Sequence, residues 1–270
     1  FGDFVIDNFV AEYIAGRTPN PCVLCNTHIK WTALLKRANS LDCEFIATGH
    51  YAQVKDLNGR KFISKGADPH KDQSYVLWGL SQEALQRTQF PVGKFTKPEV
   101  RQIAFDAGYA ELSKKSESYE ICFVPDNDYR GFLKRRIPEL EEQVKGGNFI
   151  NTKGEVIGKH EGYPFYTVGQ RKGLGTAFGQ PMFVTEIQPE TNTVVLGELD
   201  ELIRNSMSVY QVNSMKYERI PDGLEALTKV RYKDAGTMSQ LSNTPDGKIS
   251  VEFHANVNGI APGQSAVFME

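Results

Sequence analysis

The spacing of hydrophobic residues predicts helices in the first third of the chain. Apolar side chains recur three and four positions apart over residues 1–14, and Gly16 ends this helix. The same spacing predicts a second helix over residues 26–40, after a loop, residues 17–21, that two prolines keep out of helical conformation. Residues 44–48 follow as a short buried strand, and a helix followed by such a strand is typical of an α/β domain.

A third helix is predicted from its two ends. Thr96 and Glu99 have the spacing of a capping box, and Pro98 lies in the first turn, where its missing N–H costs nothing. Gly108 is placed to end this helix after Ala107. The helix extends the α/β pattern through the first half of the chain.

The hydrophobic pattern changes from about residue 148 onward. Short runs in which apolar and polar residues alternate, such as residues 193–196 and 248–253, are separated by clusters that favour turns. This half of the chain is therefore predicted to be β. The resulting division has three domains, residues 1–137, 138–206 and 207–270.

Composition narrows the class of protein. Hydrophobic residues make up 40% and charged residues 24% of the 270 positions, which is enough apolar material for folded domains. No apolar run approaches the ~18 residues of a membrane helix, so we expect no membrane partner. The net charge of −2 does not indicate nucleic-acid binding, and such a partner would need a local basic surface.

The ends of the chain and its cysteines add two expectations. The chain starts inside a predicted helix and ends inside a predicted strand, residues 265–270, so we expect a piece of a longer protein. Four cysteines without a secretory signal are too few for a disulfide scaffold, and they indicate a cytoplasmic protein.

The sharpest chemical motif is the pair Cys22 and Cys25, where a loop passes into a helix. A helix N-terminus stabilises thiolates, so the pair suits redox chemistry or metal ligation, whereas the plain alternative is two unrelated core cysteines. A zinc site needs four ligands, and Cys122 and His28 are the candidates to complete one. Three converging cysteines would instead suit a cluster with an open position or sulfurs exchanging in a disulfide. Cys43 is interpreted as core packing.

Two polar motifs in the first half are less specific. Gly49 and His50 follow the predicted strand, at the edge where open α/β sheets bind ligands, although a turn glycine beside a satisfied histidine is an equal interpretation. Lys71 could contact phosphate, while Asp72 or Ser74 could be an ordinary helix cap.

Basic segments in the second half could contact nucleic acid. A glycine-rich run, residues 169–175, offers backbone amides and Arg171 to phosphate, although its spacing is not a dinucleotide fingerprint. The basic run 134–136 is explained equally well by a solvated helix face. Residues 229–232 and 262–264 combine a cation, an aromatic ring and an amide, the ingredients of single-stranded RNA recognition.

Taken together and in order, these motifs resemble the tRNA-specific 2-thiouridylase family. The resemblance covers essentially the whole chain, and the ordered set is far more specific than any one motif. The matching segments are residues 16–26, 47–51, 71–75, 121–123, 167–175 and 262–268.

The resemblance implies a fold and an activity. The fold would be the C-terminal portion of a PP-loop α/β nucleotide-binding domain, a small central tRNA-contacting domain and a C-terminal β-barrel, with the PP-loop and the last strand missing. The activity would be ATP-dependent and Mg²⁺-dependent 2-thiolation of the wobble uridine in tRNAs for lysine, glutamate and glutamine. A persulfide sulfur-carrier protein would supply the sulfur, and a chain without its PP-loop is expected to be inactive.

The resemblance also implies roles for single residues. Cys122 would carry the persulfide, Cys25 would be the nucleophile that resolves it as a disulfide, and Gly49 would contact ATP. Three residues would contact the target base: Asn20, Pro21 and Cys22. The remaining tRNA contacts would be His50, Lys71, Asp72, Gln73, Arg231, Tyr232 and Gln264.

One position leaves the mechanism open. Cys22 stands where many members of the family carry Asp, so Cys22, Cys25 and Cys122 could hold a [4Fe–4S] cluster with one open iron. We favour the persulfide route over the cluster. Two other classes stay open: a non-catalytic RNA- or metal-binding module with structural cysteines, and a thiol–disulfide oxidoreductase. Release of AMP from ATP on addition of tRNA would separate the thiolase from both.

Overall fold

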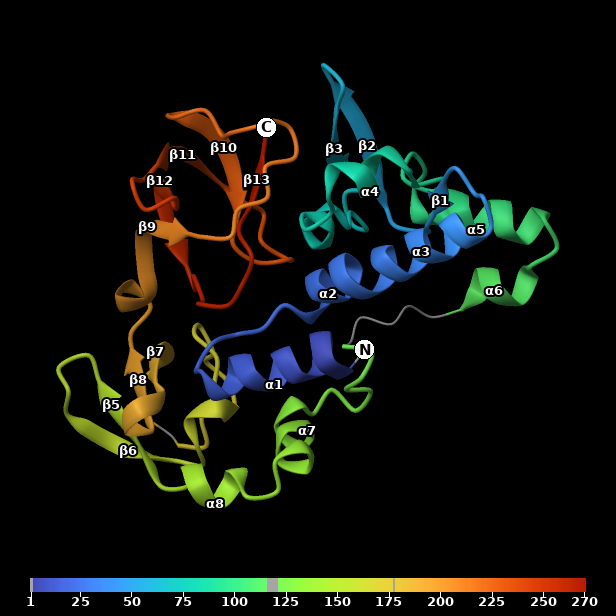
Figure 1. The fold of residues 1–270 in the computed structure, drawn as a ribbon. Helices are drawn as coiled ribbons and strands as arrows, with labels where there is room; N and C mark the ends of the chain where they lie inside the picture. The colour runs from blue at the N-terminus through green and yellow to red at the C-terminus, as the bar shows by residue number, and fades with distance from the viewer. Residues whose placement is uncertain (1, 116–120, 177) are drawn as a thin grey trace. The chain divides into compact units, whose positions relative to one another are not determined.

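The computed structural model describes residues 2–115, 121–176 and 178–270, which form two compact units (Figure 1). Of the described residues, the first unit comprises 22–115 and 212–220. The second comprises residues 2–21, 121–211 and 221–270. Each unit is therefore built from segments that are far apart in the sequence.

A continuous helical stretch opens the first unit. It consists of α2 (Pro21–Leu24), the π-helical segment η2 (Cys25–Trp31) and α3 (Thr32–Ser40). The predicted start near residue 26 is wrong, because Pro21 takes the first helical position. Proline is favoured there for two reasons. It lacks the N–H that would have no partner at this position, and its fixed φ angle already suits a helix. Sequence reasoning treated the same proline only as a helix breaker.

The strands of the first unit are short. β1 (Ile46–Ala47) pairs in parallel with β4 (Thr88–Gln89), so the strand predicted over residues 44–48 is present but shorter. β2 (Ala52–Leu57) and β3 (Arg60–Lys65) form an antiparallel hairpin. The parallel pairing of β1 and β4 is characteristic of an α/β domain, as the sequence predicted.

Trp31 organises the core of the first unit. Its side chain is 1% exposed, and its Nε1–H donates to Thr88 Oγ1 at 2.7 Å. The same Thr88 hydroxyl donates to the carbonyl of Ala84, which ties the long helix to β4. The other buried core residues are Ala38, Ile46, Ala52, Leu77, Leu80, Ala84 and Leu85. The helices around them are η3 (Ser74–Leu77) and α4 (Gln82–Gln86).

The last helices of the first unit are α5 (Lys97–Asp106) and α6 (Ala110–Lys114). The predicted capping box is confirmed, because the Thr96 N–H donates to a Glu99 carboxylate oxygen at 2.6 Å. Gly108 follows the helix with a φ angle of 89°, which confirms the predicted end.

Three helices belong to the second unit. The π-helical turn η1 (Gly2–Ile6) leads into α1 (Asp7–Ile14), as the sequence predicted for this segment. The other two are α7 (Tyr129–Arg136) and α8 (Leu140–Val144). No helix within the described ranges is long and apolar enough to cross a membrane.

The first sheet of the second unit has the strand order β6-β5-β8-β7. β5 and β8 are parallel neighbours, and the other pairs are antiparallel. All five residues of the central strand β8 are buried. The strands are β5 (Gly147–Asn151), β6 (Val156–His160), β7 (Phe183–Gln188) and β8 (Thr193–Gly197). Three short 3₁₀ segments flank them: Tyr163–Phe165, Pro189–Thr191 and Asp200–Leu202.

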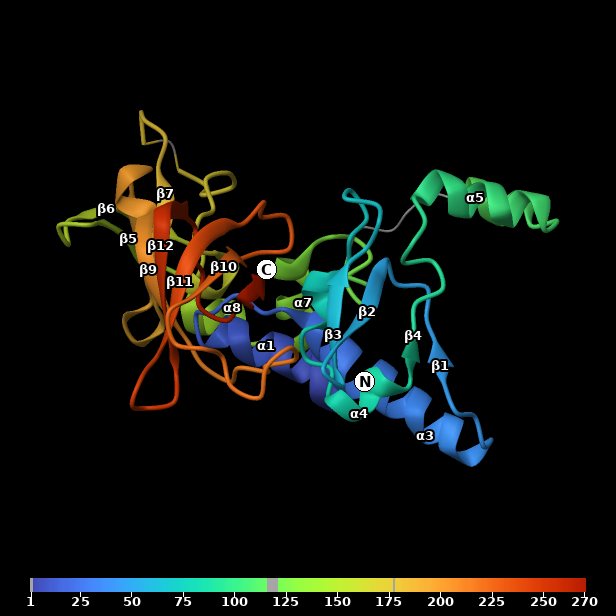
Figure 2. The ribbon, with the colours of Figure 1, turned by 90° about the horizontal axis from the view of Figure 1, so that it is seen from above.

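The second sheet is antiparallel, with the order β13-β10-β11-β12-β9 (orange to red in Figure 2). Its strands are β9 (Ile203–Val209), β10 (Leu224–Lys229), β11 (Thr237–Asn243), β12 (Ile249–Asn258) and β13 (Val267–Met269). This sheet confirms the β character predicted for the end of the chain. The division into three domains stays a prediction.

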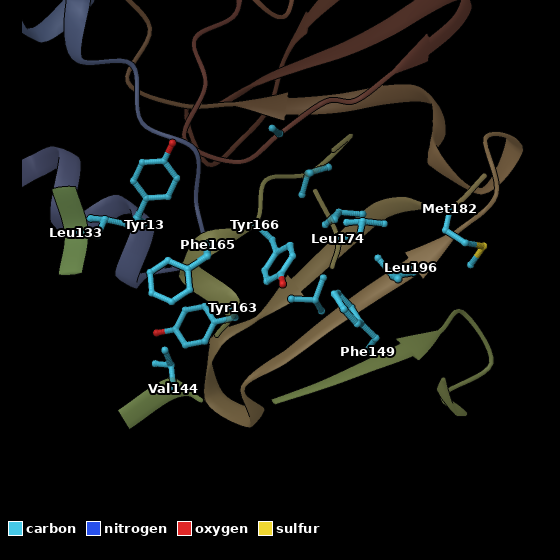
Figure 3. Close-up of a cluster of buried hydrophobic side chains, with 14 of the residues drawn as sticks. Tyr13, Leu133, Val144, Phe149, Tyr163, Phe165, Tyr166, Leu174, Met182 and Leu196 are labelled. Atoms are coloured by element: carbon cyan, nitrogen blue, oxygen red, sulfur yellow. The ribbon is translucent and has the colours of Figure 1, made fainter. Parts of the chain in front are cut away.

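Aromatic side chains form the core of the second unit (Figure 3). Phe9 of α1 contacts the ring of Phe123 at 5.2 Å, and Tyr13 stacks on Tyr129 at 4.8 Å between ring centroids. The Tyr163 hydroxyl donates to the carbonyl of Ile14 at 2.7 Å, which satisfies one acceptor at the end of α1. The first helix of the chain is therefore held by residues that lie more than one hundred positions later.

His160 is a titratable group inside this core. It is 5% exposed, its Nδ1 accepts the Gly162 N–H at 3.0 Å, and its Nε2 has no hydrogen-bond partner among the described residues. Burial lowers the pKa of His160 from 6.5 to about 4. The imidazole is therefore neutral at neutral pH, with its proton on Nε2.

This burial predicts an acid-sensitive core. The unfolded chain binds a proton at His160 near pH 6.5 and the folded chain only near pH 4. The contribution of the neutral His160 to the free energy of unfolding is therefore fully present above about pH 6.5 and is lost as the pH falls toward 4. The free energy of unfolding attributable to His160 should fall by about 2 kcal/mol between pH 7 and pH 5. Urea unfolding of the wild type and His160→Phe at both pH values measures it, with His70→Phe at an exposed histidine as the control. An equal pH dependence in the wild type and His160→Phe would contradict this prediction.

Candidate functional site

A clamp holds the loop that carries Asn20. The Thr18 N–H donates to the carbonyl of Pro262 at 2.8 Å. Gln264 Nε2 donates to the carbonyls of Thr18 and Pro19 at 3.1 and 3.0 Å. The sequence assigned Asn20 and Gln264 to separate contacts. In the structure, Gln264 holds the loop segment that directly precedes Asn20.

The clamp also has a polar contact at each end. Asn20 Nδ2 donates to Ser265 Oγ at 3.5 Å, a long hydrogen bond. On the other side, the Arg17 guanidinium contacts the Glu12 carboxylate at 2.8 and 2.6 Å, which raises the pKa of Arg17. Sequence reasoning missed Ser265, and the turn signal Pro-Gly before Gln264 was the available clue.

Cys22 and Cys25 lie three positions apart at the start of the helical stretch that begins at Pro21. Cys22 is exposed, and Cys25 is half-buried and opens the π-helical segment η2. π-Helical turns occur frequently at functional sites, and the helix N-terminus favours the thiolate form of cysteine. The geometry of this pair supports sulfur chemistry more than core packing.

Cys122 is presented to solvent by an anchored turn. The Val124 N–H donates to the carbonyl of Ile121 at 2.8 Å, which closes the turn around the cysteine. Ile121 and Phe123 pack against the aromatic core of the second unit, and Val124 is 2% exposed. Cys122 is therefore exposed on a turn whose flanking residues, Ile121 and Phe123, are packed against the core.

The remaining cysteine differs from its prediction. Cys43 is exposed rather than buried, because β1 starts only at Ile46 and leaves Cys43 in the preceding loop. None of the four cysteines, all of which are described, forms a disulfide in this structure. Among the described residues, no three His, Cys, Asp or Glu side chains gather as metal ligands.

Gly49 and His50 follow β1 at its carboxyl end. A Cβ on Gly49 would meet no heavy atom within 4 Å, so a ligand can approach the backbone there. His50 Nδ1 shares a hydrogen bond of 2.9 Å with Thr48 Oγ1, and its ring lies 5.4 Å from that of Trp31. Burial and the nearby Lys30 lower the pKa of His50 to about 4, so it is a neutral hydrogen-bonding group.

The structure joins Gln73 to this motif. Gln73 Oε1 accepts the Tyr51 N–H at 3.0 Å, and the Gln73 N–H donates to the Tyr51 carbonyl at 2.9 Å. The Asp72 carboxylate accepts from the Ser74 hydroxyl at 2.7 Å and from the Gly66 N–H at 3.0 Å. Asp72 also accepts the Ser74 N–H at 3.2 Å, so it braces the start of η3, although the N-cap position of that helix is Gln73. Gln73 is thus bonded to Tyr51, the residue that follows His50.

Arg231 is inserted between two glycines. Its Nε donates to the carbonyl of Gly259 at 2.9 Å, and its Nη2 donates to that of Val168 at 2.7 Å. Gly169 and Gly259 have φ angles of 85° and 68°, and a Cβ on either would lie 3.1 Å from Nη2. The guanidinium therefore has a structural role that its motif did not reveal. The adjacent Tyr232 is 42% exposed.

The basic residues of the second unit divide into two groups. The three cations at the end of α7 are paired, with distances of 3.0, 3.1 and 3.0 Å for Lys134–Glu141, Arg135–Asp126 and Arg136–Asp7. This pairing favours the solvated-face interpretation of residues 134–136. Arg171 and Lys172 are exposed, and neither has an ion-pair partner in the part of the chain that the structure describes. Arg171 borders a hollow of about 520 Å³ lined by Gly173, Leu174 and Gly175.

Comparison with known proteins places these motifs in a family. Family models match residues 1–126 (tRNA methyl transferase HUP domain), 130–198 (tRNA methyl transferase PRC-barrel domain) and 204–270 (aminomethyltransferase beta-barrel domain). The chain is 62% identical over 272 residues to the tRNA-specific 2-thiouridylase MnmA of Amoebophilus asiaticus. The chain belongs to the MnmA tRNA-specific 2-thiouridylase family. The predicted resemblance and the mixed α/β and β fold class are confirmed.

Other MnmA relatives match over the same extent. The proteins of Cytophaga hutchinsonii and Salinibacter ruber are 60% and 50% identical to the chain, both over 272 residues. All three matches cover 100% of this chain, and they cover 72%, 73% and 71% of the relatives. The match therefore includes every motif described above, from the clamp loop to the turn at Gln264.

The position of Arg231 generates a stability prediction. Arg231→Ala should lower the free energy of unfolding by about 2–3 kcal/mol, because it removes a charged donor from two carbonyls. Lys233→Ala, which removes the same charge from an exposed neighbour, should change it by less than about 0.5 kcal/mol. Urea unfolding measures both variants. Equal stability of the two would show that the Arg231 contacts contribute nothing.

Proposed function

We propose that this chain carries the sulfur chemistry of ATP-dependent 2-thiolation at the wobble uridine of tRNA. The observation that carries the proposal is the placement of Cys25, half-buried at the start of η2, and of Cys122, exposed on a turn closed by a backbone hydrogen bond. The family relatives are named tRNA-specific 2-thiouridylases, which agrees with thiol chemistry on a tRNA base. The proposed compartment is the cytoplasm.

The chemical problem explains why two thiols are needed. The C2 oxygen of uridine is a poor leaving group, and ATP, with Mg²⁺, supplies an adenylyl group that lets this oxygen leave as AMP. The terminal sulfur of a persulfide on Cys122 attacks C2. The Cys25 thiolate then attacks the Cys122 sulfur, which breaks the S–S bond and leaves 2-thiouridine and a Cys25–Cys122 disulfide. An external thiol reductant reopens the disulfide, and a sulfur-carrier protein restores the persulfide.

The other site residues have proposed binding roles. Asn20, Pro21 and Cys22 contact the target base, which must leave the anticodon stack to react. Gly49 fits the ATP site, because its backbone is open to a ligand at the carboxyl end of a parallel strand. The proposed tRNA contacts are His50, Lys71, Asp72, Gln73, Arg231 and Tyr232. The proposed substrates are the tRNAs for lysine, glutamate and glutamine.

A [4Fe–4S] cluster is the second candidate for sulfur delivery. Cys22 and Cys25 lie three positions apart on one helical stretch, where side chains share a face, and Cys122 would be the third thiolate. Three thiolates suit a cluster with one open iron, which would supply sulfide to the base. The persulfide route is favoured because it needs only the two cysteines that the family resemblance assigns to catalysis.

Two cysteine variants test the proposal. Cys25→Ser and Cys122→Ser should each abolish 2-thiouridine formation by the complete protein, because each removes a sulfur that forms or breaks a bond. Cys43→Ser, at another exposed cysteine, should retain most activity. Nucleoside analysis of tRNA digests measures the product and separates a sulfur-for-oxygen exchange from methylation. Normal 2-thiouridine in either of the first two variants would overturn the assignment.

Cys22→Ser distinguishes the two sulfur routes. Under the persulfide proposal, activity should fall only a few-fold, and a Cys25–Cys122 disulfide should remain detectable by mass spectrometry. A brown chromophore after anaerobic incubation with iron and sulfide, lost together with activity in Cys22→Ser, would replace this route by the cluster. AMP release on addition of tRNA separates both routes from a non-catalytic module and from an oxidoreductase.

The unpaired cations generate a prediction about RNA binding. Arg171→Ala and Lys172→Ala should each lower the slope of log K against log salt by about one, because each removes one phosphate contact. Arg135→Ala, whose guanidinium is paired with Asp126, is the matched control and should leave the slope unchanged. Equilibrium binding of tRNA at several salt concentrations provides the slopes. A slope change in the control as large as in the test variants would refute this role.

A further inference from the structure

The loop between α1 and α2 has few backbone N–H groups that could form hydrogen bonds within the loop. Pro19 and Pro21 have no N–H, so the short irregular segment 17–20 cannot make a regular set of backbone hydrogen bonds. Its carbonyls at Thr18 and Pro19 accept instead from one side chain, that of Gln264. The conformation of this loop therefore depends on a residue about 245 positions away.

Both N–H donors of the Gln264 side chain are used by this contact. A side-chain NH₂ group has two hydrogens, and Nε2 donates to two carbonyls at 3.1 and 3.0 Å. The turn that presents it is also fixed, because the Gln264 N–H donates to Ala261 and the Pro262 carbonyl accepts from Thr18. Gly263 has a φ angle of 88°, and a Cβ there would lie 2.7 Å from the Thr18 carbonyl oxygen. The two segments are thus in close backbone contact.

We propose that Gln264 is a positioning residue that sets the loop for the target base, rather than a group whose amide donates to tRNA. This inference rests on the proposed role of Asn20 at the base. Asn20 follows the two clamped carbonyls directly, and among the described residues its side chain has a single long hydrogen bond, to Ser265. A displacement of about 1 Å at such a group can cost about 100-fold in rate, so the clamp acts on the chemical step.

Two substitutions at one position separate the roles. Gln264→Glu keeps the size of the side chain but directs carboxylate oxygens at two carbonyls, so it should release the loop. Gln264→Lys has an ammonium group that donates to both carbonyls, so it should retain the clamp. Gln143→Glu on α8 makes the same charge change at an exposed residue of the same unit and is the control.

The first readout needs neither tRNA nor ATP. Hydrogen exchange of the peptide that contains Thr18 reports the clamp, because the Thr18 N–H is bonded to Pro262. Exchange should become at least about tenfold faster in Gln264→Glu and should stay near the wild-type rate in Gln264→Lys and Gln143→Glu. Unchanged exchange in Gln264→Glu would overturn the proposal whatever the fate of the thiolation assignment.

The second readout uses tRNA and the complete protein. Gln264→Glu should lower the rate of thiolation at saturating tRNA by at least about tenfold, with the tRNA Kd changed by less than about threefold. Gln264→Lys should restore the rate. A Kd that rises about tenfold or more at an unchanged saturated rate would show a direct tRNA contact and overturn the positioning role. A wild-type protein without thiolation would refute the proposed function, while the exchange result would still decide the clamp.

Discussion

The packing of Phe9 against Phe123 is the contact on which both candidate loops of the second unit depend. It places α1, and with it the loop that carries Asn20, in the same aromatic core as the turn that carries Cys122. The loop that carries Asn20 contains two prolines without an N–H, and the turn that carries Cys122 is closed by the Val124 N–H and the Ile121 carbonyl. Their geometry comes from buried rings on one side and from single polar anchors, such as Gln264, on the other.

Local ion pairs decide which basic residues of the second unit are available to bind an anion. A net charge of −2 gives no indication of an RNA partner, and a count of basic residues would point first to α7. Pairing with Glu141, Asp126 and Asp7 neutralises the three cations at the end of that helix, whereas Arg171 beside the hollow keeps its charge available. Binding capacity therefore follows from which cations are neutralised locally, and sequence composition does not contain this information.

Sequence reasoning succeeded where the determining contacts are local. The capping box at Thr96 and the helical spacing before Gly16 involve residues within one or two helical turns, so their pattern was sufficient. Pro21 was misjudged because proline both ends and begins helices, and only the surrounding fold selects between these roles. The hydrogen bonds of Arg231 and Gln264 were not predicted because their partners lie 63 and about 245 positions away. Such pairings leave no periodic trace in the chain.

The interleaving of the two units has a consequence for biosynthesis. Residues 2–21 belong with partners that begin at residue 121, so α1 leaves the ribosome about a hundred residues before the core that covers it. At about 5–20 residues per second, its apolar face stays uncovered for several seconds, during which chaperones and non-native partners compete for it. The first unit likewise waits for residues 212–220, whose Asn213 side chain bonds the Trp78 and Leu80 carbonyls. The order of translation therefore sets the earliest time at which each unit can complete its core.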